Sequence, residues 1–375
     1  MGIFKSLFRK SDSKPSSKSP TITVQISEQP VKKPTLHLRG KKDCNGLYPA
    51  ELVMLSVAEN FKTTSTEFAG YLTYTYEISN PAKMLKDLSS RGFLVVASPK
   101  YSLPKYKVAE LKEFASAVGL TPKGKKADIV FSLNAVDDTV LDPLIKDRYW
   151  ALTDAGRKAL DDNPYIQYFL SGHKYSVSEV GVDIWTVNEE FVANPKRPYR
   201  DIIFHQISEK MNDASIDFQL HPGSGDASTY TYCWCLRLMG LFMEEEARSY
   251  SGAADYYFQY LFSWINLHHG LNLLKAYRLF KNDREYQKDL IPRFYEDIKL
   301  YPGQREELLR FIDELNISSE EVRDALITSF KRAQFGGIMT PEETADFIIL
   351  ELSGDVDQSE KLAIKLAKKA VKQIK

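Results

Sequence analysis

The stretch KVAELKEFASAVGLTPKGKKADIVFSL, residues 107–133, predicts two short helices joined by a tight turn. Gly119 fits a C-terminal cap for the first helix, Pro122 blocks its continuation, and Gly124 relieves the turn before the second helix. Lysines therefore flank the start of the second helix, where free backbone N–H groups and the positive end of the helix dipole favour anions. Apolar residues recur at the spacing of helices with one buried face, at Val108, Leu111, Phe114, Ala115, Ile129, Val130 and Leu133.

This stretch resembles the SAP family, a helix-extended-helix DNA-binding module, over about residues 105–135. The matching positions are Val108, Leu111, Lys112, Gly119, Leu120, Gly124, Lys126 and Leu133. The chain departs from the family pattern at Ser132, where a basic residue is usual, and at Lys123, which replaces a small hydroxyl residue. The resemblance implies contact with the DNA backbone through shape and charge, with little base reading. It assigns that contact to Lys107, Lys112, Lys123, Gly124, Lys125 and Lys126. The plain alternative is a solvated lysine turn on a small helical hairpin.

Charge is distributed unevenly along the chain. The fifty basic and fifty acidic residues cancel, so net charge alone does not attract nucleic acid. Residues 1–43 hold ten Lys or Arg against three acids, residues 105–126 hold six against two, and residues 361–375 hold six against none. Acidic residues concentrate elsewhere, as at Asp137 and Asp138. Any attraction for a polyanion must come from these local basic segments.

The elements around the hairpin resemble a winged-helix domain over residues 44–164. A helix beginning at Pro81 precedes a strand at 93–97, and a second strand at 148–152 leads to a helix capped by Thr153. The SAP-like hairpin is then an insertion at the tip of the two wing strands, a position that tolerates insertions. The alternative is a small α+β scaffold of similar elements without a groove-reading helix.

The other segments complete the predicted organisation. Residues 1–43 are rich in Ser, Pro and Lys and predict a disordered basic tail. Residues 165–200 alternate β-prone residues with Pro and Gly, which predicts an irregular or β connector, that is, a few irregular strands or a linker. Residues 201–375 predict a helical domain whose last helix packs its apolar face on the same chain or on a second copy. The expected fold class is α+β, mainly α.

No residue pattern predicts catalysis or a cofactor. Neither a nucleophile elbow nor a catalytic cysteine context occurs, and Cys233 and Cys235 lack the spacing of a zinc site. His268 and His269 are adjacent on a predicted helix and are expected to face different directions and to pack. We therefore expect no enzyme activity, no cofactor and no metal.

Three cysteines cannot form a disulfide framework and indicate a reducing compartment. The chain has no apolar run long enough for a signal peptide or a membrane span. We expect a cytoplasmic protein, associated with the nucleoid if it binds DNA. MGIFKS, residues 1–6, fits the loose myristoylation pattern, but such starts are common by chance and membrane contact is not expected.

The leading hypothesis is a non-enzymatic DNA-binding protein, regulatory or architectural, that contacts duplex DNA through the SAP-like hairpin. Its helical C-terminal half would bind itself or a protein partner. The alternative is an interaction scaffold or adaptor that acts through residues 201–375, because that half is rich in aromatic helices. An enzyme that uses the hairpin as a tether is the third possibility.

Overall fold

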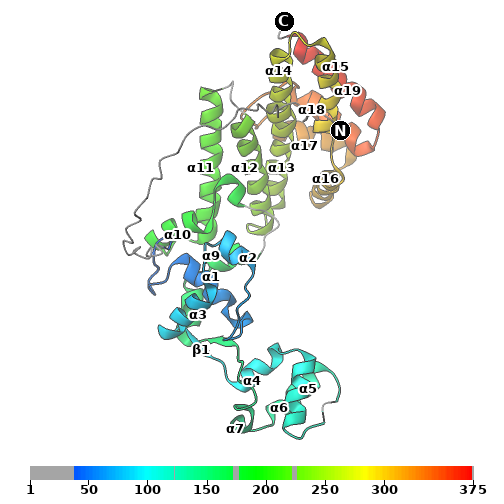
Figure 1. Cartoon of the computed structure of the whole chain (residues 1–375). Helices are drawn as coiled ribbons and strands as arrows, with labels where there is room; N and C mark the ends of the chain where they lie inside the picture. The colour runs from blue at the N-terminus through cyan, green and yellow to red at the C-terminus, as the bar shows by residue number, and fades with distance from the viewer. Residues whose placement is uncertain (1–37, 122, 172–176, 222–225, 374–375) are drawn as a thin grey trace, which may run out of the picture. The chain divides into compact units, whose positions relative to one another are not determined.

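The computed structural model describes residues 38–121, 123–171, 177–221 and 226–373 (Figure 1). Most of the predicted basic tail, together with Pro122 of the hairpin turn and Ile374 of the last helix, lies outside these residues. The described residues are mainly helical, which confirms the mainly α part of the predicted class. Their strands form a single two-stranded sheet.

The first group of elements surrounds that sheet and shares a core around Leu52, Leu88 and Trp150. Its members are α1 (Pro49–Val57), η1 (Ala58–Asn60), α2 (Gly70–Tyr74), α3 (Pro81–Ser90), β1 (Leu94–Val96), β2 (Trp150–Leu152), α8 (Asp154–Asp161), α9 (Tyr165–Leu170), η3 (Val177–Val180) and α10 (Ile184–Ala193). Strands β1 and β2 pair antiparallel, with Leu94 opposite Leu152. The two strands predicted on either side of the hairpin are thus partners.

Local capping signals position the helices next to the sheet as the sequence predicts. The Thr153 hydroxyl accepts the Gly156 N–H at 3.0 Å and begins α8. The Asn80 side chain accepts the Lys83 N–H at 2.9 Å, and Pro81 occupies the first turn of α3. The backbone carbonyl of Phe93 lies where a Cβ on Gly156 would stand, so α8 packs directly against the start of β1.

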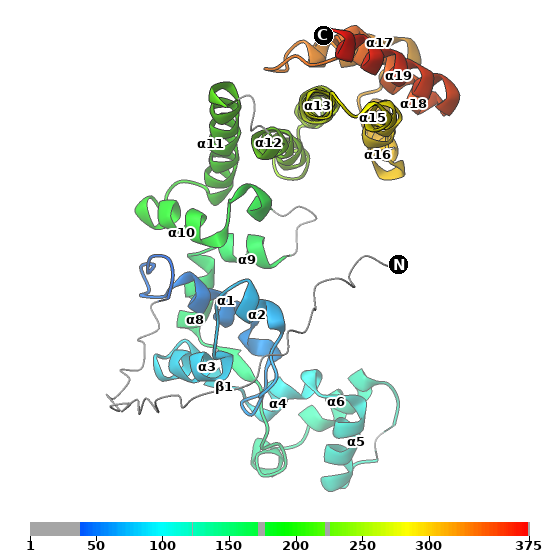
Figure 2. The ribbon, with the colours of Figure 1, turned by 45° about the horizontal axis from the view of Figure 1, so that its top comes forward.

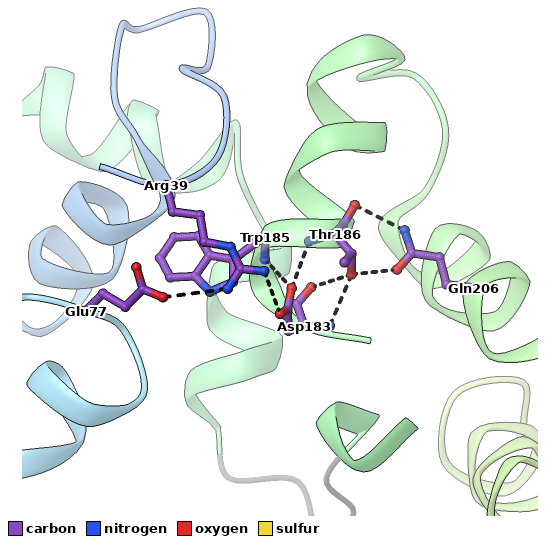
Figure 3. A network of polar contacts seen from close by, with 6 residues as sticks. All are labelled: Arg39, Glu77, Asp183, Trp185, Thr186 and Gln206. Carbon is purple, nitrogen blue, oxygen red and sulfur yellow. Dashed lines mark hydrogen bonds and ion pairs between the residues drawn. The ribbon is translucent and has the colours of Figure 1, made fainter. Parts of the chain in front are cut away.

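The prediction of an irregular β connector over residues 165–200 is wrong in the part that the structure describes, where α9, η3 and α10 are helical. Asp183 starts α10 by accepting the N–H groups of Trp185 and Thr186, each at 2.9 Å. The Thr186 hydroxyl accepts the Asp183 N–H in return, and it donates to Gln206 on the next helix (Figure 3). This reciprocal cap stabilises a helix over residues whose β-branched composition favours strands.

Arg39 ties the start of the described chain to the same cap (Figure 3). Its guanidinium lies 3.4 Å from the Asp183 carboxylate and 3.6 Å from that of Glu77, and it covers the Trp185 ring. The ion pairs are half-exposed, so each contributes little to stability by itself. Their common effect is to hold the segment before α1 against α10.

The second group follows α10, and all of its regular elements in the described residues are helices. It comprises α11 (Tyr199–Leu220), α12 (Asp226–Glu245), α13 (Tyr250–Ser263), the π-helical η4 (Trp264–His269), α14 (Gly270–Leu279), α15 (Arg284–Ile298), α16 (Pro302–Glu314), α17 (Ser319–Phe330), α18 (Pro341–Ser353) and α19 (Val356–Lys372). The last helix buries Ala363, Leu366 and Val371 in the core of this group. The sequence predicts that either the same chain or a second copy covers that apolar face, and in the structure the same chain covers it.

The π-helical turn η4 is fixed by one buried amide, that of Asn266. Its Nδ2 donates to the Phe262 carbonyl at 3.1 Å and to the Thr344 hydroxyl at 2.9 Å, and its Oδ1 accepts the Met339 N–H at 2.8 Å. Gly337 passes so close that a Cβ there would lie 2.2 Å from the Asn266 Cβ. A side chain in a π turn thus joins η4 to α18 and to the preceding loop.

The two groups share α12. Tyr232, Cys233 and Leu236 belong to the core of the second group, whereas Leu238 and Met239 belong to the core of the first. The core of the first group therefore continues well beyond residue 200. None of the helices in the described ranges is both long and apolar enough to cross a membrane.

Candidate nucleic-acid interface

The predicted helical hairpin, residues 107–133, lies in a small lobe between β1 and β2. We call this lobe the α4–α7 lobe (residues 98–147). It contains α4 (Pro99–Ser102), η2 (Leu103–Lys105), α5 (Val108–Ala117), α6 (Lys126–Asn134) and α7 (Asp138–Leu141) (Figure 2). Its core is separate from the other two and consists of Leu103, Tyr106, Leu111, Ala115, Ile129, Leu133, Leu141 and Ile145. The two predicted helices are present, and they are covered by flanking turns that the sequence analysis did not predict.

The turn between α5 and α6 has positive backbone φ angles at its two glycines. Gly119 ends α5 with φ +77°, and the Leu120 N–H reaches back to the Ala115 carbonyl at 2.9 Å. Gly124 has φ +88°, in the left-handed region that favours glycine. The Asp128 carboxylate then accepts the Lys125 N–H at 2.7 Å and closes the first turn of α6. These contacts fix where the lysine turn, residues 123–126, stands.

All the lysines that the SAP resemblance assigns to DNA contact are exposed; they are Lys107, Lys112, Lys123, Lys125 and Lys126. No ion pair joins any of them to a carboxylate within the described ranges, although Lys107 lies close enough to Glu110 to lower the pKa of its carboxyl. Gly124 is also exposed. Lys123, Gly124, Lys125 and Lys126 are brought together by the turn, whereas Lys107 and Lys112 stand on α5.

Five acids of the lobe contact groups other than the lysines of the turn. Lys62, from outside the lobe, pairs with Glu110 at 3.1 Å and with Asp147 at 3.4 Å. Asp138 pairs with Lys100 at 3.5 Å, and Asp142 pairs with Arg148 at 2.9 Å. Asp137 caps α7 through Thr139. The carboxylates of these four pairs are therefore directed to cations outside the lysine turn, and the acid at the turn itself is Asp128, which accepts the Lys125 N–H.

Lys62 also anchors the lobe. Burial alone would raise the pKa of the Glu110 carboxyl, but hydrogen bonds from the Lys107 N–H and the Lys62 ammonium hold that pKa below its ordinary value. Burial would lower the pKa of Lys62, and its two carboxylate partners raise it instead. Glu110 thus stabilises the fold above its unfolded pKa and loses this effect as pH falls through the folded pKa. Both groups are charged at neutral pH.

Changing Gly124 to Ala is expected to destabilise the lobe by about 1–2 kcal/mol, because alanine is strained at this positive φ. The new Cβ would also lie 2.4 Å from the Asp128 Oδ2 that caps α6. Thermal unfolding followed by circular dichroism would measure the loss. Gly303→Ala is the matched control, since nothing lies within 4 Å of a Cβ there. Equal stability of the two variants would contradict this account of the turn.

The histidine pair differs from the expectation that its members face apart. The His268 and His269 rings lie with their centroids 4.9 Å apart, and both pack on Trp264. Both histidines belong to the π-helical η4, whereas the prediction assumed an α-helix. Burial, with a smaller effect of His268, lowers the pKa of His269 to about 4. The two histidines pack, as expected, but their rings lie side by side and do not face apart.

One exposed residue of the lobe was not singled out from the sequence. Phe131 lies on α6 with 80 % of its surface accessible, whereas Phe114 of α5 packs edge-on against Tyr106 at 5.1 Å. The available signal was its helical phase: Phe131 stands two residues from both Ile129 and Leu133, and so on the opposite face of α6 from these buried residues.

No known protein family, curated protein or solved structure matches the chain.

Proposed function

We propose that this chain is a non-enzymatic DNA-binding protein whose α5–α6 hairpin, a SAP-like module, contacts the phosphate backbone. The observation that carries the proposal is the lysine turn at the N-terminus of α6, whose three lysines are exposed and make no ion pair within the described residues. Three lysines stand within four residues, while Glu110, Asp138, Asp142 and Asp147 pair with Lys62, Lys100 and Arg148. Phosphate is the anion that such a cluster of exposed cations favours.

The surroundings of the hairpin support the proposal. The lobe emerges between β1 and β2 of a body that resembles a winged-helix domain, and it has its own core. A folded lobe fixes the backbone of its lysines, so it loses less backbone freedom on binding than a lysine tail does. Contacts to phosphate position a protein without reading sequence, so we expect sequence-tolerant binding.

A salt titration of duplex binding by the full chain tests this function. If four or five phosphates are neutralised, the logarithm of the association constant should fall with the logarithm of salt at a slope of about −4. Lys112→Gln should make that slope shallower by about one unit, because it removes one phosphate contact. A wild-type chain that shows no duplex binding at low salt, or binding that salt does not weaken, would contradict the proposal.

A further inference from the structure

The α4–α7 lobe joins the first group of elements, which we call the body, at a single narrow hinge. The chain leaves β1 at Ala97 and returns at Tyr149, just before β2, and the Ala97 N–H donates to the Tyr149 carbonyl at 2.9 Å. Both covalent connections therefore pass through one hydrogen-bonded pair. Because the lobe also has a core of its own, these connections alone leave it free to rotate about the hinge.

Tyr149 is the pivot of this hinge. Its N–H donates to the Ser102 hydroxyl at 3.3 Å, and its own hydroxyl donates to the Lys105 carbonyl at 3.3 Å. Arg148, one residue before the pivot, pairs with Asp142 of the lobe at 2.9 Å. Each of these contacts begins at the hinge, so each locates the lobe but opposes its rotation less than a contact from elsewhere on the body.

Two residues of the body, Glu59 and Lys62, contact the lobe from outside the hinge and carry opposite charges. The Lys62 ammonium lies 3.1 Å from the Glu110 carboxylate on α5, and these two side chains are only 26 % and 34 % exposed. The Glu59 carboxylate accepts the Tyr101 hydroxyl of α4, and its backbone carbonyl accepts the Lys105 ammonium at 2.7 Å. Since α4 and α5 are different elements of the lobe, contacts to both oppose its rotation.

We propose that Glu59 and Lys62 form a clamp that fixes the orientation of the α4–α7 lobe on the body, and that loss of the clamp lets the folded lobe rotate about the hinge. This inference goes beyond the proposed DNA binding and does not depend on it. The Lys62 ammonium also lies 4.9 Å from the centroid of the Tyr106 ring of the lobe. An ion pair, a hydrogen bond and a cation–π contact together favour the clamped state by about tenfold.

Pulsed dipolar spectroscopy on the full chain, without DNA, tests the clamp. Spin labels at Ala117→Cys in the lobe and Ser90→Cys in the body occupy exposed positions, and Cys44→Ser removes the exposed natural cysteine. The labelled parent should show one narrow distance distribution. Lys62→Met with Tyr101→Phe removes the ammonium and the hydroxyl but retains the apolar parts of both side chains, and it should give a broad distribution. A distribution that these substitutions leave unchanged, or one already broad in the parent, would overturn the proposal.

Lys100→Met is the matched control, because it makes the same change in charge as Lys62→Met and breaks an ion pair inside the lobe, with Asp138 at 3.5 Å. Its distance distribution should equal that of the labelled parent. Hydrogen exchange separates rotation from unfolding, since the amides of Leu111 and Ile129 in the lobe core should stay protected when the clamp is removed. Loss of their protection would show that the lobe unfolds, which also contradicts the proposal.

Discussion

Simultaneous replacement of Lys123, Lys125 and Lys126 by Glu is expected to weaken duplex binding by at least about 10²-fold at low salt, because most of the phosphate contacts disappear and three repulsive charges replace them. The slope of the logarithm of the association constant against the logarithm of salt should become shallower, from about −4 to between about −2 and about −1. The three side chains are exposed and make no ion pair within the described residues, so the fold should be unchanged. An electrophoretic shift assay across a salt series would measure affinity and slope together.

A control with the same change in net charge separates a local contact from general attraction. Lys361, Lys365 and Lys368 are exposed on α19, and their replacement by Glu also changes the net charge by six units in the same direction. At about 0.15 M salt this variant should bind duplex within about twofold of wild type, because charges more than about 8 Å from the contact are screened there. If the two triple variants lose affinity equally, binding reflects net charge and the lysine turn has no special role.

Replacing Asn266 by Ala is expected to lower the free energy of unfolding by about 3–4 kcal/mol. The side chain is fully buried, and its loss leaves the Met339 N–H and the Phe262 carbonyl without their partner. Each buried polar group left unsatisfied costs about 1–3 kcal/mol, and the cavity beside Gly337 adds to the loss. Urea unfolding followed by circular dichroism would give the difference, and the melting temperature should fall with it.

Two further variants define the cause of that loss. Asn212→Ala removes an exposed amide from α11, and it should change stability by less than about 0.5 kcal/mol. Thr344→Val removes a single hydroxyl from the Asn266 network and should cost about 1 kcal/mol. The DNA affinity of folded Asn266→Ala should equal that of wild type, since the substitution lies outside the lobe. A loss below about 1 kcal/mol for Asn266→Ala would show that the amide does not fix η4.

The features that the sequence predicts well are those encoded by neighbouring residues. Gly119 and Gly124 mark the turn because only glycine adopts their positive φ without strain, and Thr153 marks the start of α8 because its hydroxyl satisfies a nearby N–H. The strands beside the hairpin are likewise predicted from their β-prone composition and their positions before and after it. Phosphate contact by the lysine turn stays a prediction.

The features that escape prediction depend on residues far apart in the chain. Nothing local to Glu110 or Asp147 indicates that Lys62 pairs with both, although these pairs direct two carboxylates of the lobe away from its lysine turn. The segment 165–200 reads as β-prone because of its composition, while the Asp183 cap and its link to Gln206 favour helix. The π turn at η4 depends on Asn266 meeting Met339 and Thr344, which are more than seventy residues away.

The division of α12 between two interiors has a consequence for how the molecule comes apart. Tyr232 and Leu236 face one interior, and Leu238 and Met239 face the other, so melting of either uncovers half of the same helix. Heat should therefore disrupt both groups in one cooperative event, and a fragment cut near residue 200 would expose an apolar stripe and aggregate. The α4–α7 lobe shares no core residue with either interior, so it can open by itself while the rest of the molecule stays intact.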